Sequence, residues 1–216
     1  MLRAAKLSLE LSLLIVGLPL ALGVLAYAGY FGLTHPLFSI PSGSGIPTVL
    51  EGDLVLTRGS KFACGSIKPR PGDLVLFRHK QYDYLKRLIG LPGDRVQFKN
   101  GVLVLNGQAV AQKREGEMDL TLAGSTQKAE VVRETLPNGK SYLISLVDRA
   151  AEPENTPEFI LPSGQYFVVG DSRDNSLDSR FGQDVDGIGF VPAENLCAVA
   201  VRVLSSTDRT HIWMAL

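Results

Sequence analysis

The sequence has few of the residues that most often build metal or cofactor sites. It contains two cysteines and three histidines in 216 residues. Neither cysteine has a close partner or nearby histidines at the spacing of zinc ligands, so we expect no structural metal site and no cofactor. The acidic stretch "DSRDNSLDS" (171–179) lacks the spacing and central glycine of a calcium loop, and nearby "DVDG" (184–187) is too short to bind calcium alone.

The sequence also lacks an excess of positive or negative charge. Lys and Arg number 22, Asp and Glu number 22, and no long basic run occurs. The chain therefore has no positive field with which to attract nucleic acid, and we expect no nucleic-acid partner. Cys64 and Cys197 could be two buried thiols or one disulfide. Of these two, we expect two thiols.

Only one long hydrophobic run is present, from Leu11 to Leu33. As a helix rising about 1.5 Å per residue, it covers roughly the 30 Å core of a bilayer. Arg3 and Lys6 precede it, so residues 1–10 are expected in the cytoplasm, 11–33 in the membrane and 34–216 on its outer side. The alternative is a cleaved secretory signal ending near Ala28, but the run is longer than the usual core of such a signal.

After this run, short apolar or alternating segments follow one another between turn residues, which predicts a mostly β domain. Asn100-Gly101 is the strongest hairpin signal, because a type I′ turn needs positive φ at both central residues. Residues 108–135 are highly charged with weak periodicity, and we expect them to be exposed and partly mobile. Residues 108–160 as a whole should form a less regular, variable β insertion. The expected strands are 53–59, 72–79, 84–90, 94–98, 101–105, 141–146, 164–170 and 196–204.

The segment "PSGSGIPT" (41–48) places Ser44 between two glycines. Composition alone indicates a linker, but a serine in such a loop can also be a nucleophile if a base takes its proton. The three histidines, at 35, 79 and 211, have no sequence context that suggests a triad. The Gly-x-Ser-x-Gly nucleophile motif is absent as well, because Ser42 and Ile46 occupy its glycine positions.

A lysine can act as the base if burial keeps it uncharged. Lys86 lies in "YLKRLIG" (84–90), where alternation puts it on one face with Tyr84 and Leu88, and Arg87 on the other. Lowering its pKa to roughly 7–8 takes about 3–5 kcal/mol of desolvation, which is within the range of buried lysines. Alone, the pattern favours a surface lysine with a partly buried stem.

Four segments together resemble the signal peptidase I family, which comprises membrane-anchored serine proteases that remove signal peptides from exported proteins. They occur in the family's order and cover about a quarter of the chain. The N-terminal run and "GFVP" (189–192) agree with the resemblance. The four segments are "IPSGSGIPTVLEGD" (40–53), "RPGDLVLF" (70–77), "YLKRLIGLPGDRV" (84–96) and "GDSRDNSLDSRFG" (170–182).

The resemblance implies a signal-peptidase-like β core and a role for each matching residue. Ser44 matches the nucleophile and Lys86 the general base. The hydroxyl of Ser42 and the backbone N–H of Ser44 match the oxyanion hole. The supporting positions are Ser176, which would orient the lysine, an ion pair between Asp178 and Arg180, and a possible pair between Asp171 and Arg87. The positions matching the substrate pockets are Ile40, Val49, Tyr84 and Leu85.

Two positions depart from the family pattern. Gly45 stands where methionine usually follows the nucleophile, and Ser172 where asparagine usually follows "GD". Because Gly45 removes an apolar side chain next to the site, we expect Lys86 to be more hydrated, and activity to be weaker or pocket specificity altered.

The resemblance predicts a signal peptidase that cleaves exported preproteins after Ala-x-Ala at the membrane surface. Its partners would be signal peptides and membrane lipid. Three alternatives remain. A specialised pilin or conjugation peptidase of the same superfamily is one, and a catalytically inactive, membrane-tethered binding homologue is another. A LexA-type self-cleaving repressor also pairs Ser with Lys, but it needs a DNA-binding helical domain where this chain has a hydrophobic run.

Overall fold

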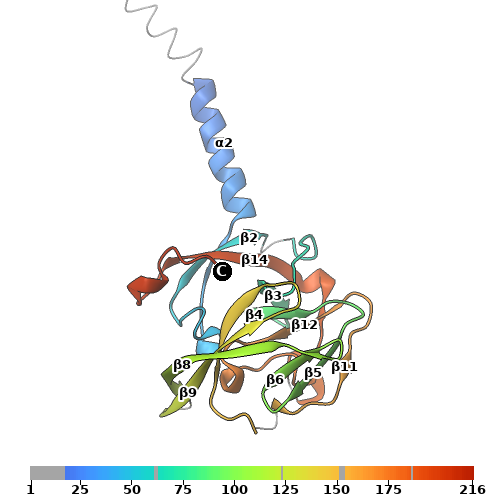
Figure 1. Ribbon diagram of the computed structural model, residues 1–216. Coiled ribbons are helices and arrows are strands. Elements are labelled where there is room, and N and C mark those ends of the chain that lie inside the picture. Colours follow the sequence, from blue (N-terminus) through green and yellow to red (C-terminus); the bar gives the residue numbers. More distant parts are fainter. Residues whose placement is uncertain (1–17, 61–62, 123, 151–153, 186) are drawn as a thin grey trace, which may run out of the picture.

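The computed structural model describes residues 18–216 except 61–62, 123, 151–153 and 186 (Figure 1). One helix, α2 (Leu18–Thr34), leads into a domain built almost entirely of antiparallel strands, as the turn pattern predicted. All eight predicted strands are present to within two residues at each end. The described 3₁₀ turns are η2 (Gly43–Gly45), η4 (Arg173–Asn175), η5 (Gln183–Val185), η6 (Ala193–Asn195) and η7 (Arg209–His211).

The largest sheet carries the predicted site residues. Its seven strands lie in the order β1 (Leu37–Ser39), β2 (Leu54–Gly59), β14 (Leu196–Ser205), β3 (Leu74–His79), β4 (Tyr82–Gly90), β12 (Gln165–Val169) and β13 (Val191–Pro192). The tight β3–β4 hairpin turns at Lys80, whose φ is +55°. The sheet therefore places strands distant in sequence beside one another.

Two smaller sheets complete the domain. The four-stranded sheet has the order β11 (Phe159–Ile160), β5 (Arg95–Lys99), β6 (Val102–Leu105) and β7 (Gln108–Ala109). Asn100 and Gly101 both have positive φ between β5 and β6, which confirms the predicted turn. The three-stranded sheet has the order β10 (Ser141–Leu146), β9 (Ser125–Thr135) and β8 (Ala111–Leu122).

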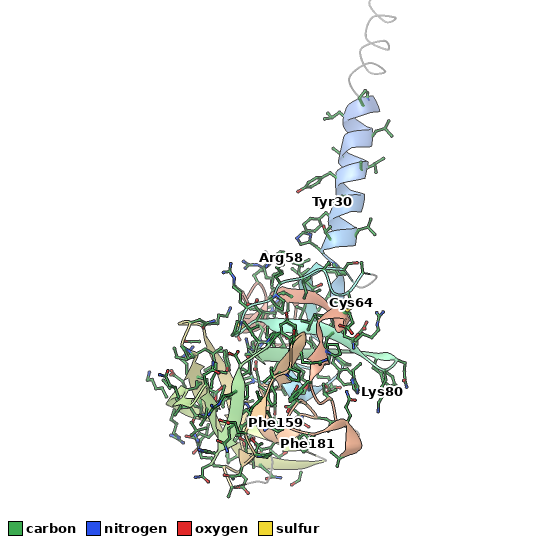
Figure 2. All side chains as sticks on the ribbon, turned by 90° about the vertical axis from the view of Figure 1, so that its right-hand side faces the viewer. Tyr30, Arg58, Cys64, Lys80, Phe159 and Phe181 are labelled. Carbon is green, nitrogen blue, oxygen red and sulfur yellow. A yellow bond between two sulfur atoms is a disulfide. The ribbon has the colours of Figure 1, made fainter. Side chains whose placement is uncertain are left out.

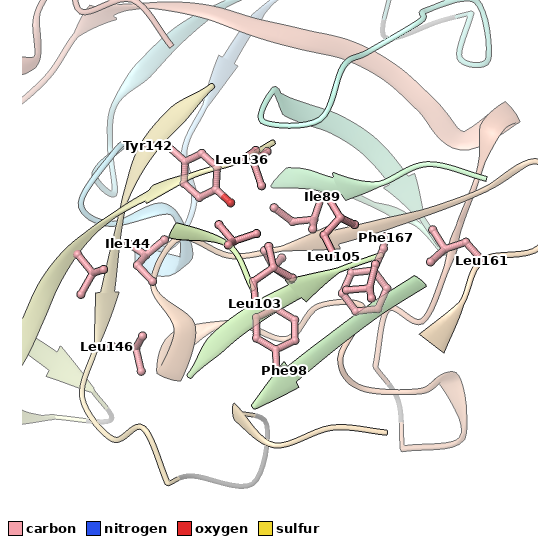
Figure 3. Packing of buried hydrophobic residues seen from close by; sticks show 14 residues of the cluster. Ile89, Phe98, Leu103, Leu105, Leu136, Tyr142, Ile144, Leu146, Leu161 and Phe167 are labelled. Carbon is pink, nitrogen blue, oxygen red and sulfur yellow. The ribbon is translucent and has the colours of Figure 1, made fainter. Parts of the chain in front are cut away.

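Strand β4 contributes to three apolar clusters at once. Ile89 belongs to the largest, which joins the small sheets and β12 and is shown in Figure 3. Leu85 packs in a second cluster with Ile40 and Val49, and Leu88 in a third. Because neighbours cover it on both faces, β4 is buried without interruption from Leu85 to Gly90. This explains why charged residues in the middle of this strand lie inside the protein.

The predicted irregular insertion is more regular than expected. Strands β8 and β9 form a long hairpin that continues into β10. Periodicity was weak because residues 113–115 and 125–128 are exposed on both faces, so no continuous apolar stripe marks the strands. Ladder bonds and cross-strand pairs stabilise the hairpin instead, such as Lys128 with Asp119 at 2.6 Å. The segment 108–135 thus forms paired strands, and its partial mobility stays a prediction.

The preference for two free thiols was also wrong. Cys64 and Cys197 form a disulfide across 133 residues of sequence. Cys197 is the second residue of β14 and is buried, and Cys64 lies in the connection from β2 to β3. Figure 2 shows Cys64 at the end of the β domain from which α2 projects. The two cysteines meet because β14 pairs directly with both β2 and β3.

Helix α2 projects away from the β domain in both views (Figures 1 and 2). Its described side chains are exposed and carry no charge, with Leu25 and Tyr27 about 70% exposed. Within residues 18–216 as described, no helix is both long and apolar enough to cross a membrane. Residues 11–17 of the predicted span lie outside the described part.

Candidate active site

The predicted nucleophile lies on a tight 3₁₀ turn. Ser44 is the middle residue of η2, and its partly buried side chain has its Oγ 3.3 Å from that of Ser42. Ser42 itself is in extended conformation (φ −155°, ψ 161°). The backbone N–H of Ser172 donates a 3.1 Å hydrogen bond to the carbonyl of Ser44. The turn is thereby joined to the motif at 170–182, over a hundred residues later in the chain.

Lys86 is buried, although the alternation alone favoured a surface lysine. Only 4% of the residue is exposed, and its Nζ donates a 3.0 Å hydrogen bond to the Oγ of Ser176. Burial lowers the pKa of Lys86 from its ordinary 10.5 to about 8, although Asp178 opposes the shift. A substantial fraction of this amine is therefore uncharged near neutral pH, as a general base requires.

Gly170 lies where the Ser44 turn meets the segment that holds Ser176 and Asp178. Its backbone N–H donates a 2.9 Å hydrogen bond to Oδ2 of Asp178. An ideal Cβ on this residue would lie 2.2 Å from the Oγ of Ser176 and 2.8 Å from the carbonyl oxygen of Ser44. Only glycine permits this close approach.

Both predicted ion pairs are present and buried. Arg87 donates to both carboxylate oxygens of Asp171 at 2.7 and 2.5 Å, and to the carbonyl of Gly72 at 2.6 Å. Arg180 donates to both oxygens of Asp178 at 2.9 Å each. Such bidentate pairs fix the orientation of both side chains in addition to pairing their charges. The Arg87–Asp171 pair holds the loop after β12 against β4, whereas the Arg180–Asp178 pair lies within that loop.

One cavity of about 340 Å³ joins the predicted catalytic and substrate residues. Ser42, Ser44 and Lys86 line it. The predicted pocket residues line the same cavity: Ile40, Val49, Tyr84 and Leu85. Two residues that the sequence did not single out, Tyr82 and Asp83, extend the lining along β4.

An unpaired strand edge runs beside this cavity. On one side, β4 pairs with β3 from Tyr82 to Arg87. On the other, β12 pairs with β4 only from Arg87 to Gly90. Among the described strands, none covers the second edge of residues 82–86. This edge is suited to accept an extended peptide by strand addition.

Gly45 does not expose the lysine to water, contrary to expectation. An ideal Cβ on Gly45 would lie 2.4 Å from Cγ2 of Val49. Val49 is itself 1% exposed, so its side chain fills the space that a side chain at position 45 would need. Lys86 itself is only 4% exposed, so its amine is desolvated with glycine at position 45.

Gly170, Glu134, Glu154 and Arg173 were not assigned roles from the sequence. Gly170 and Arg173 lie within a recognised motif, which was the available signal. The two glutamates pair with Arg173 and Arg180 respectively. Both come from the insertion, and nothing in their local sequence indicates a buried partner.

Sequence comparison with known proteins finds relatives of this chain. The family described as signal peptidase, peptidase S26, matches residues 12–204. Signal peptidase I of Rickettsia canadensis (strain McKiel) is 33% identical over 203 residues, which cover 80% of this chain and 72% of the relative. Signal peptidase I of Pseudomonas aeruginosa is 36% identical over 190 residues, covering 78% of this chain and 64% of the relative. A solved signal peptidase I from Enterococcus faecalis V583 is 27% identical, with a TM-score of 0.35, and the match covers 62% of this chain and 97% of that one.

Proposed function

The chain belongs to the peptidase S26 family of signal peptidases, which are serine endopeptidases, and we propose that it removes N-terminal signal peptides from exported preproteins with a Ser44–Lys86 dyad. The observation that carries the dyad is the environment of Lys86. The amine is buried, has a pKa of about 8, and lines one cavity with Ser44.

The proposed reaction passes through an acyl-enzyme. Ser44 Oγ attacks the scissile carbonyl while Lys86 takes its proton, and Lys86 then protonates the departing amine. A water molecule deprotonated by Lys86 hydrolyses the ester and releases Ser44. The N–H of Ser44 and the hydroxyl of Ser42 would stabilise the oxyanion, and Ser176 would hold the lysine in place.

We propose that the substrate binds as an added strand along residues 82–86 of β4. The open edge supports this mode, since main-chain hydrogen bonds there do not depend on substrate sequence. Specificity would come from the cavity wall, where Ile40, Val49 and Leu85 leave room for small side chains. Cleavage after Ala-x-Ala is the expected preference.

The proposed location is the outer face of a membrane, with residues 11–33 as the anchor and 1–10 in the cytoplasm. The uncharged, exposed surface of α2 supports an apolar environment for this helix. The Cys64–Cys197 disulfide supports an oxidising compartment for the β domain. Membrane lipid would then be a permanent partner.

A specialised pilin or conjugation peptidase is the second candidate. The observation in its favour is the contact of Gly45 with Val49, which shapes the cavity beside the nucleophile without a side chain at position 45. Profiling cleavage of preprotein substrates against pilin-type substrates separates the two.

The test is cleavage of an Ala-x-Ala preprotein in detergent by the full chain, from about pH 6 to 10. We expect the rate to rise through an apparent pKa near 8. Ser44→Ala and Lys86→Ala should abolish it, whereas Lys99→Ala, at an exposed position of β5, should not. A folded wild-type protein that cleaves no such substrate would support an inactive homologue instead.

A further inference from the structure

Lys86 belongs to a cluster of buried charged side chains. Four carboxylates face three guanidinium groups and the lysine amine, so the cluster is neutral only when Lys86 is protonated. The carboxylates are Glu134, Glu154, Asp171 and Asp178, and the arginines are Arg87, Arg173 and Arg180. Two of these acids, Glu134 and Glu154, come from the 108–160 insertion, and neither belongs to a motif that suggested the dyad.

Arg180 uses every nitrogen of its guanidinium. Nε and Nη2 donate to the two oxygens of Asp178, and Nη2 also donates to the carbonyl of Arg173 at 2.6 Å. The remaining nitrogen, Nη1, donates to Oε1 of Glu154. The side chains of Arg180 and Glu154 are both fully buried. Loss of this glutamate would therefore leave a buried donor and a buried positive charge without their partner.

Glu154 is held in place from the other side of the domain. Its carbonyl accepts a 3.1 Å hydrogen bond from Gly101, in the β5–β6 turn, and Asn155 accepts one from the N–H of Asn100 at 2.9 Å. The ring of Phe98 on β5 lies beneath the guanidinium of Arg180, 5.5 Å away. The hairpin thus fixes the glutamate, and the glutamate fixes the arginine.

The contact reaches the dyad through Asp178. This carboxylate, oriented by Arg180, also accepts the N–H of Gly170, whose Cα region packs against Ser176. Ser176 in turn accepts the hydrogen bond of Lys86. The charges that act on Lys86 are Asp178, Arg180 and Asp171, which is itself paired with Arg87. Two of these three groups belong to the pair that Glu154 orients.

We propose that Glu154 is a positioning residue for the proposed reaction, which fixes the Arg180–Asp178 pair so that Ser176 and Lys86 keep their working geometry and charge. The proposal rests on the proposed function. Burial raises the pKa of Glu154 and the neighbouring Arg180 opposes the rise, so the ion pair favours the charged carboxylate. Through Glu154, the β5–β6 hairpin thereby influences the geometry and charge of Lys86, although it lies outside the catalytic sheet.

Glu134 offers a matched control. It is also fully buried and paired with an arginine, Arg173, at 2.5 Å. Its carboxylate also accepts from Gln112 on β8 at 3.0 Å. Arg173, however, is not among the charges that act on Lys86. Glu134→Gln and Glu154→Gln therefore remove the same buried charge, but only Glu154 bonds directly to Arg180, whose charge acts on Lys86. Glu134 reaches Arg180 only through Arg173, whose backbone carbonyl accepts from Arg180.

The experiment uses the full chain in detergent, as wild type, Glu154→Gln and Glu134→Gln. Three quantities are measured: thermal unfolding, kcat and KM for the preprotein across pH, and titration of Lys86 by NMR of ¹³C-labelled lysine, assigned with Lys86→Ala. We expect both variants to unfold at lower temperature. Only Glu154→Gln should lower kcat, on the order of 10-fold or more with little change in KM, because it misplaces the base.

Lys86 should also titrate at lower pH in Glu154→Gln, since Arg180 then has less negative charge around it. Equal titration in wild type and Glu154→Gln overturns the inference, and so does an equal change in Glu134→Gln. The NMR titration decides this even if the wild type cleaves no preprotein, an outcome that contradicts only the proposed function. If Glu154→Gln does not fold, Glu154→Asp replaces it, and a wild-type kcat and titration in that variant overturn the inference.

Discussion

The backbone of Gly170 lies so close to Ser176 that a Cβ at residue 170 would fall 2.2 Å from the serine Oγ. The same Cβ would fall 2.8 Å from the carbonyl of Ser44. A methyl group here must displace the partner of the lysine, the nucleophile turn, or both.

Gly170→Ala is expected to lower kcat on the order of 100-fold, because a displacement of about 1 Å at a catalytic centre has that effect. Preprotein cleavage under saturating substrate measures it. Gly116→Ala is the control, since no atom lies within 4 Å of its ideal Cβ and its φ needs no glycine. Wild-type kcat in Gly170→Ala would show that the loop adapts without affecting the site.

Lys86→Met is expected to stabilise the protein at neutral pH. The pKa of Lys86 is about 8 in the folded state and 10.5 when solvated. Between these values the unfolded chain binds more protons, so wild-type stability rises with pH from about 8 to 10.5, and below about 8 the buried amine costs up to about 3 kcal/mol.

Urea unfolding at several pH values measures this effect. The advantage of Lys86→Met over the wild type should be largest below about pH 8 and shrink towards pH 10.5. Lys99→Met, at an exposed position, should show no such dependence. A stability difference for Lys86→Met that is constant with pH would contradict the lowered pKa.

Gly45→Ala and Val49→Ala are expected to compensate each other. Alone, the alanine at position 45 overlaps Val49 Cγ2 at 2.4 Å and should cost about 1–3 kcal/mol of unfolding free energy. Alone, Val49→Ala leaves a cavity among Ile40 and Leu85. Together, the new methyl group occupies part of that space.

The double variant should therefore be more stable than the sum of the single effects predicts, by about 1 kcal/mol. Denaturant unfolding of all four proteins gives the coupling energy. Additivity to within about 0.5 kcal/mol would mean that Val49 moves away at little cost.

Removal of the disulfide should lower stability without altering the site. Cys64→Ala/Cys197→Ala releases a loop closed across 133 residues, which typically costs about 2–5 kcal/mol. Urea unfolding should show the same loss for the variant and for reduced wild type. The apparent pKa of cleavage should stay where it is, because neither cysteine lines the cavity. An unchanged unfolding midpoint after reduction would argue against a stabilising bond.

The sequence alone was sufficient for the features that depend on neighbouring residues. Asn100-Gly101 predicted its hairpin because positive φ is a local property of those residues. Alternation along "YLKRLIG" predicted the face of Lys86, and β4 buries it. The four motifs indicated the family. All seven residues predicted to form the dyad, the oxyanion hole and the substrate pockets line one cavity.

Tertiary structure alone decided the features that depend on contacts between distant segments. Cys64 meets Cys197 because β14 inserts between β2 and β3. Val49 fills the space beside Gly45, and the local sequence around the nucleophile does not reveal this contact. Glu154 reaches Arg180 only because the β5–β6 turn holds it there. Local pattern fixes which way a side chain faces, whereas the partner it meets is set by the packing of the sheets.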